Sequence, residues 1–84
     1  MNSIMQTQAK ALGDLCQKAQ EHHKFINAND DLKAHLYLEQ MQVPVDIQDK
    51  ILNAIHRLKS INSDKILIII EHCSKNQVSE KLLH

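Results

Sequence analysis

The side chains best suited to chemistry in this 84-residue chain are six histidines and two cysteines. Four of them form the adjacent pairs His22-His23 and His72-Cys73. Neighbouring residues on a helix point about 100° apart, so neither pair chelates a metal well. No stretch matches the paired-cysteine or His-Glu-x-x-His spacings of zinc sites. We therefore expect no native metal site and no cofactor.

Two wider spacings could also supply pairs of metal ligands. Cys16 and His23 share a helix face, but two turns separate them by roughly 10 Å. His35 and Glu39 are four residues apart and could share an ion, although two solvated side chains on a helix surface explain the spacing equally well. A nucleophile needs a base beside it and a third group to orient that base, and no cysteine or serine lies in such a pattern. A phosphate-binding loop needs several glycines, and Gly13 is the only one. The sequence therefore predicts a protein that is not an enzyme.

The elements that would position these side chains are helices. Sheets need tight turns rich in Gly, Pro, Asn and Asp, whereas this chain has one glycine and one proline, Pro44. A chain of this length forms one domain. We expect a single all-α domain over residues 1–84, a small bundle of four helices with short connections. The expected helices cover residues 3–26, 31–42, 46–61 and 64–73, and residues 75–83 form either a short fifth helix or a continuation of the fourth.

The first expected helix carries a heptad pattern. Its two seven-residue rows form the seams of a heptad repeat, and they contain Met5, Leu12, Ala19 and Ile26 in one row and Ala9, Cys16 and His23 in the other. Small residues in these rows permit close helix packing, either within the chain or against a second copy. The candidate contact residues of this helix are therefore Met5, Leu12, Ala19, Ile26, Cys16 and His23. His23 is expected to be a partly buried core residue, with a pH-sensitive switch as the alternative.

The middle of the chain predicts two helices separated by Pro44. Asn29 or Asp30 is the expected cap of the second helix, and Asp46 of the third. Residues 35–38 also fit a short alternating strand, but no glycine turn nearby supplies a partner strand. The third helix has the clearest amphipathic stripe, with apolar residues at spacings of three and four, namely Ile47, Ile51, Ala54, Ile55 and Leu58.

The most hydrophobic stretch is the run of five apolar residues from Ile66 to Ile70. It is far shorter than the roughly 20 residues that cross a bilayer. Its composition favours a strand, but the absence of a second strand favours a helix capped by Ser63. We expect the protein's own helices to cover two sides of this run and another molecule to cover a third. Ile66, Ile69 and Ile70 are therefore candidate contact residues.

The charge balance argues against an electrostatic field that would attract nucleic acid. Ten basic residues balance ten acidic ones, and nine of the ten cations are lysine. The alternative is a DNA-associated transcriptional regulator, in which Arg57, Lys59 and Lys75 contact DNA together with His56. The ordinary interpretation is that these cations solvate a helix end.

The favoured function is that of a small non-enzymatic interaction protein. It would act as a regulator, adaptor or inhibitor through apolar helix faces, with a protein partner and as a homodimer, and not at a membrane. A second alternative is a structural component or chaperone of a larger assembly. The N-terminus lacks a secretory pattern, so we expect a cytoplasmic location with reduced thiols, a disulfide between Cys16 and Cys73 being the alternative. The composition suggests a bacterial or phage source.

Overall fold

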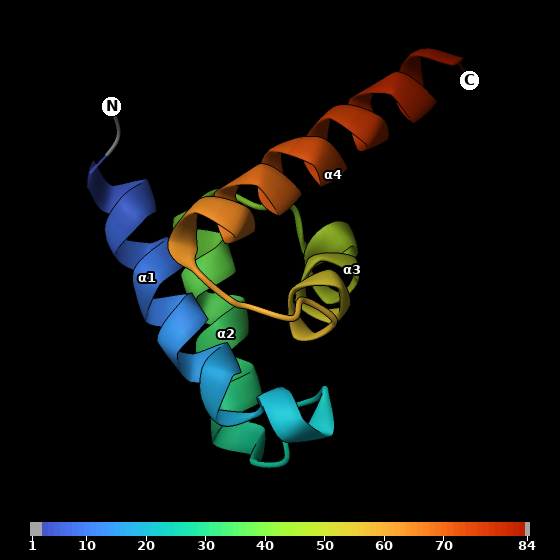
Figure 1. Ribbon diagram of the computed structural model, residues 1–84. Coiled ribbons are helices and arrows are strands. Elements are labelled where there is room, and N and C mark those ends of the chain that lie inside the picture. The colour runs from blue at the N-terminus through green and yellow to red at the C-terminus, as the bar shows by residue number, and fades with distance from the viewer. Residues whose placement is uncertain (1–2, 84) are drawn as a thin grey trace.

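Residues 3–83 form four α-helices and one 3₁₀ turn (Figure 1). The computed structural model describes the backbone of residues 3–83 and the side chains of residues 4–75. The elements are α1 (Ser3–Lys18), η1 (Gln20–His22), α2 (Ala28–Gln40), α3 (Val45–His56) and α4 (Ser63–Leu83). Residues 3–83 contain no strand, and both segments with a strand alternative, 35–38 and 66–70, are helical. The all-α prediction is confirmed.

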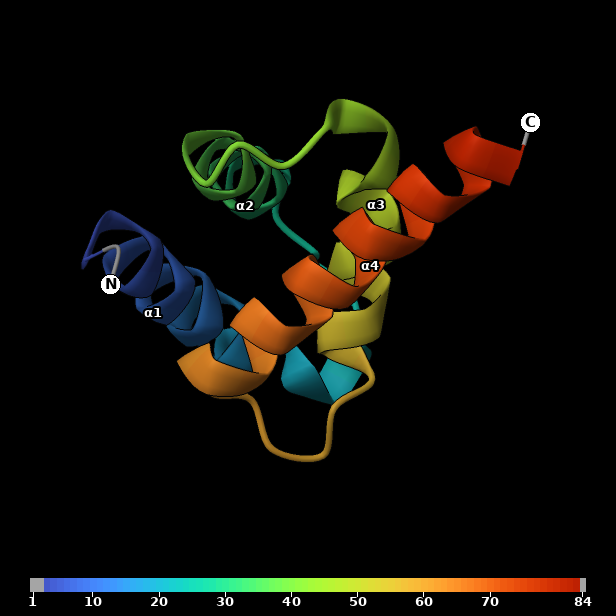
Figure 2. The same cartoon turned by 90° about the horizontal axis from the view of Figure 1, so that it is seen from above.

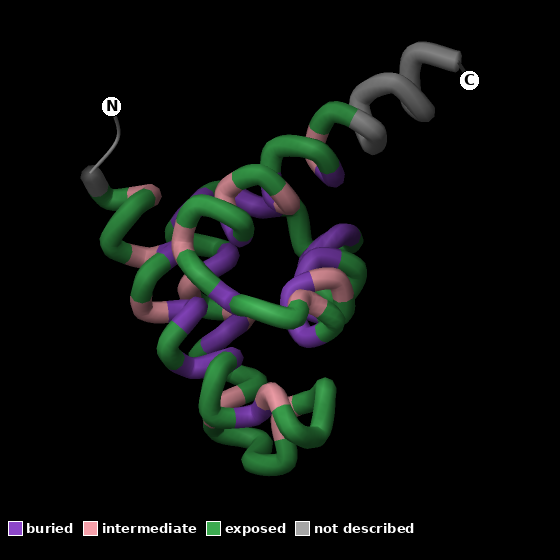
Figure 3. Tube along the Cα trace, in the orientation of Figure 1, coloured by how far each residue is buried: buried purple, intermediate pink, exposed green. Residues whose placement is uncertain are grey.

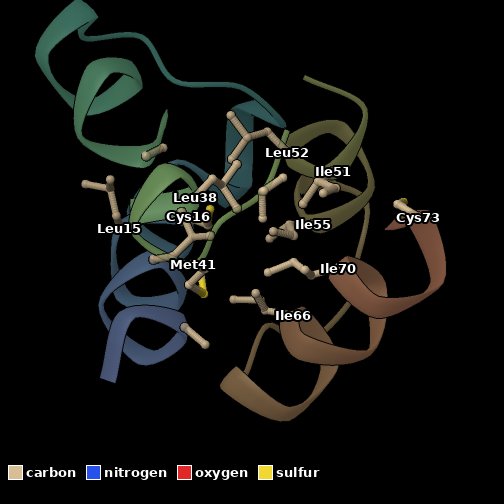
Figure 4. Packing of buried hydrophobic residues seen from close by; sticks show 14 of the residues in the cluster. Leu15, Cys16, Leu38, Met41, Ile51, Leu52, Ile55, Ile66, Ile70 and Cys73 are labelled. Atoms are coloured by element: carbon tan, nitrogen blue, oxygen red, sulfur yellow. The ribbon is translucent and has the colours of Figure 1, made fainter. Parts of the chain in front are cut away.

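The helices close a ring of contacts in which α1 packs on α2, α2 on α3, α3 on α4 and α4 on α1. Figures 1 and 2 show α1 and α2 side by side and antiparallel, with α4 crossing over α1 and continuing past α3. The chain thereby encloses one core that receives side chains from all four helices (Figure 4). Its largest fully buried apolar residues are Leu12, Leu38, Ile51, Ile55 and Ile66.

The stripe predicted on the third helix faces this core. Ile51 and Ile55 have no exposed surface, and Ile47 is 8% exposed. Ala54 and Leu58 lie beside them and are half-buried. Apolar periodicity alone was sufficient to orient α3 because the helix buries one continuous side.

The first helix is much shorter than the heptad rows indicate. It ends at Lys18 rather than at residue 26, and η1 and a left-handed residue, His23 (φ 56°), then redirect the chain. Residues 20–24 are all polar, so extending the helix through them would bury no apolar surface. The Gln20 side chain instead donates to the carbonyl oxygens of Leu58 and Lys59, which favours the turn.

The second helix begins and ends with side-chain and backbone caps. Asn27, not Asn29 or Asp30, is its N-cap, and the Asn27 side-chain oxygen accepts from the Asn29 amide at 2.8 Å. At the other end, Val43 N–H donates to Leu38 C=O and Gln42 N–H to Glu39 C=O. This is a Schellman motif, with Gln42 in the left-handed conformation at φ 63°. It lets α3 follow α2 after only four residues.

The third and fourth helices also differ from expectation at their ends. Pro44 is the N-cap of α3, which places Asp46 in the first turn, and α3 ends at His56 instead of residue 61. Asn62, not Ser63, caps α4 by accepting from the Lys65 amide at 2.9 Å. Residues 63–83 form a single helix, so the alternative of a separate fifth helix over 75–83 is wrong.

Candidate functional site

The predicted contact row of the first helix belongs to the protein's own core. Leu12 and Cys16 have no exposed surface, Ala19 is 8% exposed, and Met5 is half-buried against the same cluster. Figure 3 shows buried stretches along α1. A partner reaches none of the three buried side chains without opening the bundle. The expectation that these three residues contact a partner is therefore wrong, and the alternative of packing within the chain holds, because α2 and α4 already cover α1.

The last two members of that row lie outside α1. His23 is exposed, and its Nδ1 lies 2.9 Å from the carbonyl oxygen of His56. This position corrects the prediction of a partly buried core histidine. Ile26 follows in the connection and is 70% exposed. Neither residue continues a helical seam, because the helix has ended before both of them.

The isoleucine-rich run is mostly enclosed by its own neighbours. Ile66 and Ile70 are buried and Ile69 is half-buried, whereas Ile68 is 64% exposed on the outer side of α4. Gly13 explains part of this enclosure, because a β-carbon added to it would lie 3.3 Å from Cδ1 of Ile66. The run therefore does not present Ile66 or Ile70 as a contact surface, which corrects the expectation for those two residues.

An apolar face that sequence reasoning missed lies on α2. Leu32 is 67% exposed and Leu36 50% exposed, while Ala34 and Leu38 on the opposite side are fully buried. Residues four apart on a helix are neighbours, so the two leucines form one patch, which we call the outer face of α2. Its signal in the sequence is that the three leucines of α2, Leu32, Leu36 and Leu38, cover too wide an arc for one buried side.

The polar residues beside the outer face balance one another in charge. Asn29, Lys33, Glu39 and Gln40 are all exposed on α2, and their helical spacing places them on either side of the leucine pair. One cation, one anion and two amides leave no net charge around the patch. Such a surface neither attracts nucleic acid nor repels a copy of itself.

A buried glutamine joins α2 to α3. Gln48 is 1% exposed, its Nε2 donates to the Val43 carbonyl at 3.1 Å, and its Oε1 lies 2.6 Å from Nδ1 of His35. Because the amide oxygen only accepts, His35 Nδ1 carries a hydrogen. Nε2 of His35 faces Asp49 at 3.4 Å and Asp31 at 3.7 Å. His35 therefore contacts Gln48, Asp49 and Asp31. The metal ion that the spacing of His35 and Glu39 would allow does not match these contacts.

A buried histidine lies at the end of α3. His56 is 3% exposed, and neither of its ring nitrogens has a hydrogen-bond partner. The Phe25 ring stands edge-on to it, with centroids 4.6 Å apart and an interplanar angle of 77°. Burial lowers the pKa of His56, and the nearby His23 lowers it further. The alternative in which His56 contacts DNA together with exposed cations is wrong, because the His56 ring is buried.

The candidate DNA-contacting cations are not brought together as one site. Arg57 is the C-cap of α3 and Lys59 follows it, both exposed. Lys75 lies twelve residues into α4, about 18 Å along that helix, and pairs with Glu71 at 3.0 Å. One of the three charges is therefore already neutralised within its own helix.

The two cysteines lie in the core of the bundle. Cys16 and Cys73 are both buried and free, so the disulfide alternative is wrong. Burial raises the pKa of the Cys16 thiol to about 12, which suppresses the reactive thiolate. Within the described part of the chain, no three His, Cys, Asp or Glu side chains are placed to hold a metal ion. No described helix combines the length and the apolar character needed to cross a bilayer.

Comparisons with known proteins give no match to a family model, to a curated protein or to a solved structure.

Proposed function

We propose that this protein is a small non-enzymatic interaction protein, a regulator, adaptor or inhibitor, which binds through the outer face of α2. The observation that carries the proposal is the pair Leu32 and Leu36, at least half exposed and directly opposite the buried side of the same helix. Single exposed apolar residues are ordinary on protein surfaces, but two on adjacent turns provide a shared contact patch.

The occupant we propose for this face is a second copy of the chain. If two α2 helices pack antiparallel about a twofold axis that passes between Leu32 and Leu36 on the outer face, Leu32 of one copy lies opposite Leu36 of the other. Asn29 then lies beside Gln40 of the second copy, where two amides can exchange hydrogen bonds. Glu39 lies beside the N-terminus of the second copy's α2, where the helix dipole favours a negative charge. The face therefore offers apolar and amide groups that can pair with those of a second copy.

The expected dimer is weak, because a single helix face buries less than the roughly 800 Å² per partner of a stable interface. We also propose a cytoplasmic location, which two free, buried cysteines support.

Sedimentation velocity over a wide concentration range tests the proposal. We expect a monomer–dimer equilibrium that Leu32→Glu with Leu36→Glu abolishes, because four carboxylates would meet across the interface. The matched control is Ile68→Glu, which adds a charge at an equally exposed apolar residue on α4 and is expected to leave the equilibrium unchanged. A monomer at every concentration, or a dimer that only the Ile68 variant disrupts, would contradict the proposed α2 interface.

A further inference from the structure

The connection between α1 and α2 is fastened to the end of α3 by a few side chains. Nε2 of Gln20 donates to the carbonyls of Leu58 at 3.2 Å and Lys59 at 2.9 Å. Nδ1 of His23 lies 2.9 Å from the carbonyl oxygen of His56, so it carries the hydrogen of this bond. The last carbonyls of a helix lack partners within the helix. The connection supplies partners where α3 ends.

The centre of this contact is the His56 ring, which Phe25 covers edge-on at 4.6 Å. The ring is buried, and both of its nitrogens lack hydrogen-bond partners. A neutral imidazole tolerates such a site at moderate cost, whereas an imidazolium would bring two N–H donors and a positive charge into it without an acceptor. Burying an unpaired charge is far more costly than burying a neutral ring.

The charged groups around the ring give the same direction. Burial has the largest effect and disfavours the protonated form; His23, from the connection, disfavours it as well. Asp31, from α2, acts in the opposite sense and is the weakest of the three influences. The pKa of His56 is therefore below its ordinary value of 6.5. The ring stays neutral at pH 7 and takes a proton in mild acid only by leaving its site.

We propose that His56 makes the connection an acid-sensitive latch: when the ring gains a proton it leaves its site, and residues 20–26 detach from the end of α3. Detachment uncovers the Phe25 ring and the end of α3, and frees the Leu58 and Lys59 carbonyls. The contact between α2 and α3 is expected to persist, because His35 there already faces two carboxylates, Asp31 and Asp49. The latch does not depend on the proposed α2 interface.

Hydrogen exchange of the full chain at pH 7.5 and 5.0, corrected for the intrinsic rate, tests the latch. In the wild type we expect protection of the amides in residues 19–27 to fall at least tenfold more than that of residues 45–52. His56→Phe keeps an aromatic ring against Phe25 and cannot be protonated, so its protection is expected to be equal at both pH values. His22→Phe, which replaces an exposed histidine of the same connection, is expected to respond like the wild type. Equal protection in the wild type at both pH values, or an unchanged response in His56→Phe, would overturn the latch.

A second measurement on the wild type keeps the test decisive if His56→Phe fails to fold. Proton NMR between pH 7.5 and 4.5 follows the titration of the His56 ring together with its cross-peaks to the Phe25 ring. We expect these cross-peaks to disappear over the same pH range in which His56 is protonated. Cross-peaks that persist after His56 has been protonated would refute the release of the connection.

Discussion

Oε1 of Gln48 on α3 accepts a hydrogen bond from Nδ1 of His35 on α2 across 2.6 Å, and the same amide donates to the Val43 carbonyl. The oxygen and one N–H group of the buried Gln48 amide are therefore paired. The amide thereby links α2 to α3, the two helices on either side of the Schellman turn. His56, about two helical turns further along α3, is also buried but has neither nitrogen paired. We therefore expect an apolar replacement to destabilise the protein at Gln48 but not at His56.

Replacing Gln48 by leucine is expected to destabilise the protein by about 2 kcal/mol. The change leaves the Val43 carbonyl and the His35 ring nitrogen without their partners, and each such loss typically costs about 1–3 kcal/mol. Urea denaturation measured at pH 7.5 gives the free energy of unfolding. Asn53→Leu is the matched control, since Asn53 is exposed on the same helix, and its effect is expected within about 0.5 kcal/mol. Equal losses for both variants would mean that the amide bonds contribute nothing.

Replacing His56 by phenylalanine is expected to leave the stability at pH 7.5 unchanged or to raise it, because no hydrogen bond is lost. The variant also removes a dependence on pH. The folded-state pKa of His56 is below the unfolded value of 6.5, so the unfolded chain binds more protons between the two values. Stability is thus fully present above pH 6.5 and falls as the pH decreases toward the folded-state pKa.

The measurement is the difference in unfolding free energy between wild type and His56→Phe from pH 7.5 to 5.0. Taking the difference cancels the contributions of the other five histidines. We expect the variant to gain relative to the wild type below pH 6.5. A difference that stays constant over this range would show that His56 has the same pKa in both states.

The burial of Gln48 and His56 has a signal in the sequence that a search for apolar periodicity overlooks. Gln48, Leu52 and His56 form a row at spacing four that runs beside the row of Ile47, Ile51 and Ile55. A helix enclosed on two sides buries both rows, and α3 contacts α2 and α4. The width of a buried side depends on how many neighbours the helix has, which a single helix sequence does not contain.

The end of α1 was not predictable for a related reason. Heptad spacing continues through Ala19, His23 and Ile26, but the helix stops where Gln20 binds carbonyls 38 and 39 residues away. Local periodicity reports only the preference of the segment itself. Tertiary hydrogen bonds decided this boundary, whereas the four-helix architecture and the orientation of α3 followed from periodicity and the scarcity of turn residues.

Replacing Gln42 by glycine is expected to stabilise the protein by about 0.5–1 kcal/mol. Gln42 has a φ of 63° in the Schellman turn, and a left-handed conformation costs a residue with a β-carbon about 1–2 kcal/mol, partly offset by the greater flexibility of glycine when unfolded. Gln40→Gly tests the same exchange two residues earlier, at the last residue of α2, where a loss of about 0.5–1 kcal/mol is expected. Thermal unfolding should move in opposite directions for the two variants; a shared direction would refute the backbone argument.

The Cys16 thiol is expected to react with a disulfide reagent only when the protein opens. Cys16 has no exposed surface, and raising its pKa from 9.0 to about 12 reduces its thiolate about a thousandfold. A Cys73→Ser variant leaves Cys16 as the sole thiol, and its labelling rate at pH 8 should follow the unfolding equilibrium as urea is added. Labelling in water as fast as in denaturant would contradict the burial of this residue.

Gly13 and Ile66 provide the last test, because they fix how closely α1 approaches α4. Alanine at Gly13 gains about 1 kcal/mol of helix propensity, but its β-carbon would lie 3.3 Å from Cδ1 of Ile66. That atom is the tip of a flexible side chain, so we expect it to shift and Gly13→Ala to be stabilising by less than the full propensity gain. Ile66→Val removes Cδ1, so Gly13→Ala should stabilise more in that background than in the wild type.

A double-mutant cycle from urea denaturation of the four proteins gives this coupling directly. Leucine at Gly13 extends the same series, since it is too large for the crossing and is expected to cost about 1–3 kcal/mol through overpacking. If Gly13→Ala has the same effect with isoleucine or valine at position 66, the two helices are not held apart by this contact. In that case the glycine would contribute only its backbone flexibility to α1.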